Sequence, residues 1–109
     1  MSIIDTAELE VIEPLSGWIG RMVHSESMSF MHYAVGSEAL PIPDHSHPQE
    51  EVWIILDGEF EVTVDGTTGK VGPGFVVSVP ANAPHAVRPL TVGTTIVVNY
   101  PLRVSLSGT

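Results

Sequence analysis

Three histidines and one glutamate in this chain have the side chains and the spacing of a metal site. One residue separates His45 from His47, Glu51 follows four residues after His47, and His85 lies much farther along the chain. Residues two apart in an extended strand point to the same face, so the imidazoles of His45 and His47 are expected to lie together. Glu51 shares that face only if the strand continues straight, and Pro48 stands where the strand can be interrupted.

Three imidazoles and one carboxylate are suitable ligands for one divalent ion of Zn, Fe, Mn, Ni or Cu. Ligand bonds of roughly 2.0–2.2 Å are expected, as for nitrogen and oxygen donors around zinc. Two other interpretations stay open from the residues alone. The four side chains could be ordinary polar residues at strand ends, or the metal could be structural, as closed four-ligand zinc sites usually are.

Short strands rich in β-branched and aromatic residues are expected to position these side chains. The candidate strands are residues 18–23, 28–35, 50–56, 60–64, 75–79, 85–88 and 94–99. Two Asp-Gly pairs, Asp57-Gly58 and Asp65-Gly66, lie between apolar runs and predict hairpin turns. Only residues 5–10 suggest a short turn or helix. The pattern predicts an all-β sandwich or barrel and disfavours a parallel α/β sheet.

Two stretches of the chain resemble the two motifs of the cupin family. The first is HSHPQEEVWIILDG, residues 45–58, and the second is GFVVSVPANAPH, residues 74–85. The resemblance extends over about residues 36–100. It implies a single cupin domain over residues 1–109, an all-β double-stranded β-helix or jelly-roll barrel, with residues 1–16 as an N-terminal segment. It also implies that one metal ion binds to His45, His47, Glu51 and His85, with coordination positions left open to water or substrate.

Three positions depart from the cupin motifs. Ala39 and Asn82 stand where the family usually has glycine, and Pro89 stands where asparagine is common. None of these changes removes a metal ligand, so they concern the loops around the site.

Two further residues are candidates for substrate binding. Trp53 lies two residues after Glu51 and should share its face of the strand, either as a pocket wall or as part of the barrel core. Arg103 follows the last predicted strand, where its guanidinium could bind a substrate carboxylate through two hydrogen bonds. A surface arginine is the alternative. The tail around Arg103 also resembles small cupins that convert unsaturated uronates. The sequence identifies no catalytic acid or base.

The remaining histidines and several aromatic residues are assigned to the scaffold. We expect His24 at the surface and His32 in the barrel without a role as a ligand. Phe30, Tyr33 and Phe75 are expected in the core.

The composition argues against several classes of partner. The chain has 13 Asp and Glu against 4 Lys and Arg, a net charge of -9, and the basic residues are scattered. Nucleic acids and anionic membranes are therefore disfavoured. The absence of cysteine excludes disulfides and thiolate chemistry. No signal peptide or membrane-length apolar run is recognised, so a cytoplasmic location is expected.

A self-association surface is also predicted. Residues 52–56 are apolar at both alternating sets of positions, which is unusual for a strand with one wet face. The outer side should therefore be covered by another sheet or by another subunit. Because a chain of 109 residues buries only a modest share of its surface, we expect a homodimer.

These observations favour a mononuclear metalloenzyme that acts on a small, oxygen-rich substrate. The metal would serve as a Lewis acid, and a sugar-acid isomerase, lyase or tautomerase fits this chemistry. Two alternatives use the same ligands: an Fe-dependent dioxygenase, and a non-catalytic protein that binds a small molecule through the metal.

Overall fold

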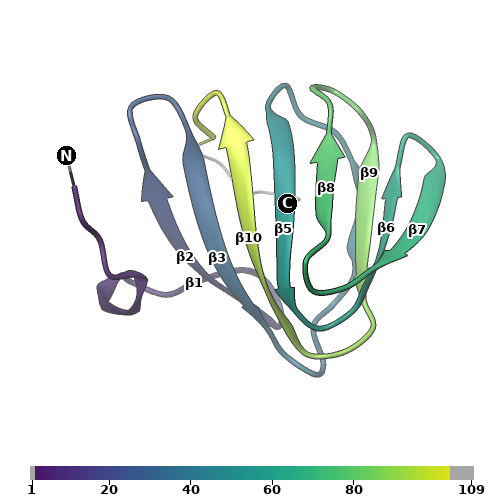
Figure 1. Ribbon diagram of the computed structural model, residues 1–109, viewed down its shortest axis with the longest axis horizontal. Coiled ribbons are helices and arrows are strands. Elements are labelled where there is room, and N and C mark those ends of the chain that lie inside the picture. Colours follow the sequence, from purple (N-terminus) through teal and green to yellow (C-terminus); the bar gives the residue numbers. More distant parts are fainter. Residues whose placement is uncertain (1, 104–109) are drawn as a thin grey trace.

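Two antiparallel sheets face each other in the protein, which a computed structural model describes over residues 2–103 (Figure 1). One sheet has six strands in the order β1 (Ile12–Leu15), β2 (Trp18–His24), β3 (Ser29–Val35), β10 (Gly93–Tyr100), β5 (Glu50–Asp57) and β8 (Val76–Val79). The other has four strands in the order β4 (Ile42–His45), β9 (His85–Pro89), β6 (Phe60–Val64) and β7 (Thr67–Val71). A single 3-10 turn, η1 (Thr6–Glu8), precedes them among the described residues. The predicted all-β fold is confirmed.

The seven predicted strands are all present, with ends that differ by at most one residue. Sequence reasoning missed β1, β4 and β7, and each of these lies at the edge of its sheet. Pro14, Pro43 and Gly69 explain the omission, because proline and glycine weaken a strand signal. An edge strand tolerates them, since one side of its backbone needs no partner.

The two Asp-Gly pairs have different roles. Asp65 and Gly66 have φ angles of 51° and 80° and join β6 to β7, so that turn is the predicted hairpin. The hairpin predicted at Asp57-Gly58 is wrong, because β5 and β6 belong to different sheets. Gly58 has a φ of 82°, and a Cβ at this position would collide with the carbonyl oxygen of Val92. The connection therefore needs glycine to cross from one sheet to the other.

An aromatic cluster fills the space between the sheets. The ring of Trp18 meets Tyr33 and Trp53 edge to face, with centroids 5.4 and 5.9 Å apart, and Phe60 completes the cluster. Of the expected core aromatics Tyr33 is confirmed. Phe75 is not in the core, because it lies before β8 and is 53% exposed.

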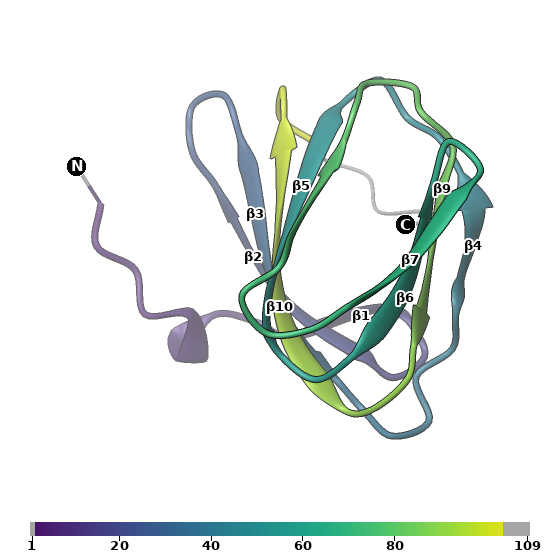
Figure 2. The same cartoon turned by 45° about the vertical axis from the view of Figure 1, so that its right-hand side comes forward.

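The ligand-bearing residues lie at one end of the sandwich. Figure 2 shows the two sheets converging at one end and spreading at the other, where β4 ends and β5 and β9 begin. His45, Glu51 and His85 occupy these strand ends. The fold therefore separates a packed apolar interior from a polar mouth.

Within residues 2–103, no second sheet covers the outer side of β5. Trp53 and Ile55 point inward and are buried, whereas Val52 and Ile54 alternate with them and lie on the outside. The four-stranded sheet packs against the inner side, so a covering sheet, one of the two expected explanations for the apolar strand, is wrong. Among the described residues, no helix is long and apolar enough to cross a membrane.

Candidate metal centre

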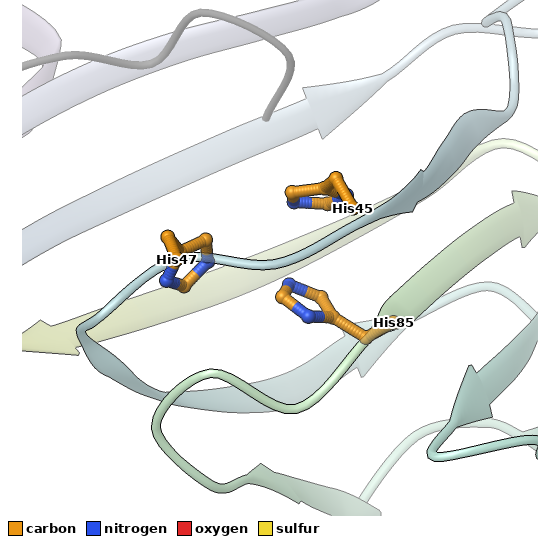
Figure 3. A group of neighbouring side chains, drawn as sticks. All are labelled: His45, His47 and His85. Atoms are coloured by element: carbon orange, nitrogen blue, oxygen red, sulfur yellow. The ribbon is translucent and has the colours of Figure 1, made fainter.

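Three histidine side chains gather at the mouth (Figure 3). His45 is the last residue of β4, His47 lies in the loop that follows, and His85 is the first residue of β9. His45 and His85 are direct partners across the paired strands β4 and β9. One potential ligand atom from each of the three residues lies within 4.8 Å of the other two. Three of the four predicted ligands, the histidines, are therefore brought together and could hold a metal ion.

Backbone carbonyl groups fix the orientation of each imidazole. Each Nδ1 lies within hydrogen-bond distance of a carbonyl oxygen: His45 with Pro43 at 2.9 Å, His47 with Gln49 at 3.1 Å and His85 with Ala83 at 2.9 Å. An Nδ1–H that donates to a carbonyl leaves the lone pair on Nε2, which is the arrangement found in metal-binding histidines.

The three Nε2 atoms have no hydrogen-bond partner in the part of the chain that the structure describes, and all three are buried. A buried polar atom without a partner costs about 1–3 kcal/mol. A divalent cation would satisfy all three lone pairs at once, so the donor set and its burial fit a metal ion.

Glu51 borders the triad from the other sheet. Its carboxylate lies 3.3 Å from Nε2 of His47 and 3.1 Å from Nε2 of His85. The strand does not run straight from His45 to Glu51, because β4 ends before Pro48 and belongs to the four-stranded sheet. The chain crosses from the four-stranded to the six-stranded sheet between the two residues, and this crossing brings Glu51 close to the histidines.

The charge on Glu51 is stabilised by its neighbours. Burial alone would raise the pKa of Glu51, but hydrogen-bonding groups on His47, His85 and Trp53 lower it well below its usual range. The indole Nε1–H of Trp53 donates to Oε2 at 2.6 Å, and Nη1 of Arg103 donates to Oε1 at 3.3 Å. Glu51 is therefore ionised and held in one position.

The pKa values of two of the imidazoles shift in opposite directions. Burial lowers the pKa of His45. Burial would also lower the pKa of His85, but Glu51 and the Ala83 carbonyl outweigh it and raise the pKa. A carboxylate that faces imidazole nitrogens is favourable only with a cation between them, either a proton or a metal.

The two candidate substrate residues both contact Glu51. Trp53 is 2% exposed and belongs to the aromatic core, so it has a scaffold role in addition to holding the carboxylate. Arg103 is 6% exposed, so the alternative of a surface arginine is wrong. The hydroxyl of Ser29 accepts from the Arg103 backbone N–H at 2.7 Å and lies 3.1 Å from its carbonyl oxygen. Contact of either candidate with a ligand stays a prediction.

Sequence reasoning missed one polar residue of the mouth. Asn99 is 4% exposed and lies directly opposite Glu51 on the paired strands β10 and β5. Within residues 2–103, its Oδ1 has no hydrogen-bond partner. The alternation of Thr95, Val97 and Asn99 could have revealed it, because a period of two places all three on the inner face.

The other two histidines lie outside the triad. His24 is exposed, as expected, and its Nδ1 lies 3.0 Å from the Ser29 hydroxyl. His32 is half-buried and pairs with Ile96 across β3 and β10, on the outer side of the sheet.

Asn82, one of the departures from the cupin motif, has a φ of 65°, a conformation that asparagine tolerates better than most residues.

Residues 29–98 match the protein family described as the cupin domain. A search of solved structures gives the same fold. An RmlC-like cupin from Shewanella frigidimarina superposes with a TM-score of 0.87 and 22% identity, covering 95% of this chain and 94% of that one. KdgF from Halomonas sp. superposes with a TM-score of 0.86 and 18% identity, covering 95% and 96%. These likenesses confirm the predicted barrel.

One curated protein is similar over a shorter stretch. Dimethylsulfoniopropionate lyase DddQ from Ruegeria pomeroyi is 45% identical over 47 residues, which is 42% of this chain and 23% of the lyase. The chain therefore matches less than a quarter of the length of that relative.

Proposed function

The chain belongs to the cupin domain family, and we propose that it is a mononuclear metalloenzyme that acts on a small, oxygen-rich carboxylate. The observation that carries this proposal is the buried triad of His45, His47 and His85. Their Nδ1 atoms face backbone carbonyls. Their buried Nε2 atoms have no hydrogen-bond partner among the described residues, and the Glu51 carboxylate lies 3.3 Å from Nε2 of His47 and 3.1 Å from Nε2 of His85. A divalent cation would satisfy these three nitrogen atoms better than any group of the protein does.

In this proposal the three imidazoles hold the metal and Glu51 is the fourth ligand. When bound, the ion supplies a Lewis acid that polarises an oxygen of the ligand. Trp53 and Arg103 hold the Glu51 carboxylate in place, and Arg103 also offers a positive charge to an anionic ligand. In a protein of net charge -9, a local cation is needed if an anion is to bind at all.

We favour a lyase or isomerase reaction within this class. The partial similarity to a dimethylsulfoniopropionate lyase supports a lyase, and the name of that substrate describes a propionate, hence a carboxylate. An Fe-dependent dioxygenase and a non-catalytic binding protein use the same triad, so the experiment must separate the three.

The test is a panel of carboxylates offered to the metal-loaded protein. It contains hydroxy acids, keto acids, an unsaturated uronate, oxalate and dimethylsulfoniopropionate, and both substrate loss and oxygen uptake are followed. We expect turnover of at least one carboxylate without oxygen uptake, and loss of that turnover in His47→Ala. Oxygen uptake would favour the dioxygenase, binding without turnover would favour the binding protein, and no binding at all would contradict the proposal.

Replacing Arg103 by alanine is expected to weaken carboxylate binding. A hydrogen bond to a charged group contributes about 1.5–3 kcal/mol, which corresponds to a loss of roughly ten- to a hundredfold in affinity. The metal content should stay unchanged, because the three imidazoles remain. Calorimetric titration of metal-loaded Arg103→Ala checks this, with Arg88→Ala as control, since Arg88 is exposed and paired with Glu61. Equal affinity in Arg103→Ala and the wild type would remove Arg103 from the ligand site.

Replacing Asn99 by leucine is expected to affect ligand binding and stability in opposite directions. The unpartnered Oδ1 is a hydrogen-bond acceptor at the mouth, so we propose that it receives a hydroxyl of the ligand. The variant should bind a hydroxy acid roughly fivefold to tenfold more weakly than the wild type, from a net hydrogen bond of about 1 kcal/mol. Its free energy of unfolding should be equal or higher, because a buried polar group is removed. Lower stability with unchanged binding would show a purely structural role.

A further inference from the structure

A row of polar side chains crosses the inner side of the six-stranded sheet at the mouth. The strand register places Ser29 of β3 between His24 of β2 and Asn99 of β10. Asn99 in turn lies opposite Glu51 of β5, whose carboxylate borders the histidine triad. The row therefore connects the edge of the mouth with the candidate metal centre.

Ser29 differs from the other residues on the inner side of β3. Met31, Tyr33 and Val35 follow it at every second position and belong to the hydrophobic core, whereas Ser29 is a small polar residue that is only 3% exposed. A buried hydroxyl adds little to an apolar core, and it costs free energy unless it is hydrogen-bonded. The groups that bind this hydroxyl therefore indicate its role.

The Ser29 hydroxyl binds both backbone polar groups of Arg103. It accepts from the Arg103 N–H at 2.7 Å and donates to the Arg103 carbonyl oxygen at 3.1 Å, and we call this pair of hydrogen bonds the Ser29 clamp. One lone pair of the hydroxyl remains, and Nδ1 of His24 lies 3.0 Å from it. A hydroxyl from a neighbouring strand thus takes the place of a strand partner for a residue beyond the end of β10.

The Ser29 clamp lies where the chain leaves the sheet and the Arg103 side chain turns to the metal centre. Strand β10 ends at Tyr100, at the same end of the sandwich at which β5 begins (Figure 1). From the clamped backbone, Nη1 of Arg103 reaches Oε1 of Glu51 at 3.3 Å. Gln49 adds only a long contact, with its Nε2 3.5 Å from the Leu102 carbonyl oxygen. The shorter bonds of the Ser29 clamp therefore fix the backbone from which the guanidinium extends.

We propose that Ser29 is a positioning residue, which holds Arg103 at the metal centre so that its guanidinium meets both Glu51 and a carboxylate ligand. The part of this inference that concerns the ligand rests on the proposed function. Arginine has a long side chain with high rotamer entropy, and ordering it together with its backbone on binding would weaken the affinity. A backbone that is fixed before the ligand arrives lowers this cost. Ser29 acts through Arg103 and does not itself contact the metal or the ligand.

The first test measures hydrogen exchange of the Arg103 amide by NMR in the zinc-loaded full chain without a carboxylate. In Ser29→Ala this N–H loses its acceptor and should exchange at least about fivefold faster than in the wild type. Thr95→Val is the matched control, because it removes another buried hydroxyl of the sheet, which donates to the Ile54 carbonyl oxygen at 2.9 Å. The control should leave the exchange at Arg103 within about twofold of the wild type. An Arg103 amide that is unprotected in the wild type, or equally protected in Ser29→Ala, would overturn the proposal.

The second test is a double-mutant cycle of glycolate binding to the metal-loaded proteins. Ser29→Ala should bind this small hydroxy acid about threefold to tenfold more weakly than the wild type, with unchanged metal content. In the Arg103→Ala background the same change should cause no further loss, because Ser29 acts through the guanidinium. Equal weakening in both backgrounds would overturn the positioning role. Absence of glycolate binding in the wild type, or wild-type affinity in Arg103→Ala, would instead count against the proposed function, and the amide exchange would then decide alone whether Ser29 positions Arg103.

Discussion

Replacing His47 by alanine is expected to lower the affinity for a divalent metal by more than about a hundredfold. Loss of an outer-shell partner alone typically costs 10- to 100-fold in metal affinity, and loss of a direct ligand should cost more. One potential ligand atom of His47 lies within 4.8 Å of those of His45 and His85, and its Nε2 lies 3.3 Å from the Glu51 carboxylate. No other imidazole of the described chain lies near enough to replace it.

The measurement is a competitive titration of chelator-treated protein with Zn²⁺, Ni²⁺ and Mn²⁺. His32→Ala is the matched control, because it removes an imidazole from the outer side of β3 and should leave the affinity unchanged. The double variant His45→Ala, His47→Ala should bind no metal tightly. Wild-type affinity in the double variant would contradict the assignment of the triad.

Replacing Glu51 by alanine is expected to lower the free energy of unfolding of the metal-free protein by about 3–5 kcal/mol. The side chains of Glu51 and Arg103 are 3% and 7% exposed, so the ion pair between them is buried. Removing one member of a buried pair takes away a charge that stabilises the other. Trp53 loses its hydrogen-bond acceptor at the same time.

Two further variants separate this effect from a simple loss of volume. Glu51→Gln keeps an acceptor for Trp53 and Arg103 and should cost less than Glu51→Ala. The double variant Glu51→Leu, Arg103→Met should also cost less than Glu51→Ala, because both charges of the pair are replaced together by apolar side chains. Urea denaturation of the four metal-free proteins measures these differences. A loss below about 1 kcal/mol in Glu51→Ala would show that Arg103 does not depend on this carboxylate.

The central strands could be predicted from the sequence because burial gives them a strong pattern. β3 and β10 alternate buried and more exposed residues along their whole length, and β5 does so from Glu50 to Leu56. The edge strands β1 and β4 could not, because Pro14 and Pro43 suppress the strand signal that burial would otherwise produce. The Asp57-Gly58 turn was misjudged for another reason: the same dipeptide serves a hairpin and a crossing between sheets, and only long-range pairing distinguishes them.

The meeting of the three histidines was predicted correctly, whereas the role of Glu51 as a fourth ligand stays a prediction and the way in which the four side chains are brought together was not foreseen. Spacing along one strand explains His45 and His47 only in part, and Glu51 arrives from the other sheet after the chain has crossed. The burial of Arg103 could not be predicted, since it follows the last strand and depends on contacts with Ser29 and Glu51, 74 and 52 residues away in the chain. The burial of a side chain that belongs to no local sequence pattern can be recognised only from the three-dimensional structure of the barrel.

The metal content of the wild-type protein tests the central claim most directly. Protein purified without a chelator, dialysed and subjected to elemental analysis should contain about one divalent transition metal ion per chain, because the described site offers one set of donors. The triple variant His45→Ala, His47→Ala, His85→Ala, prepared in parallel and shown to be folded, should contain almost none. A wild type that stays metal-free after incubation with each candidate ion, or a triple variant with the same metal content, would contradict the assignment of a metal centre to this triad.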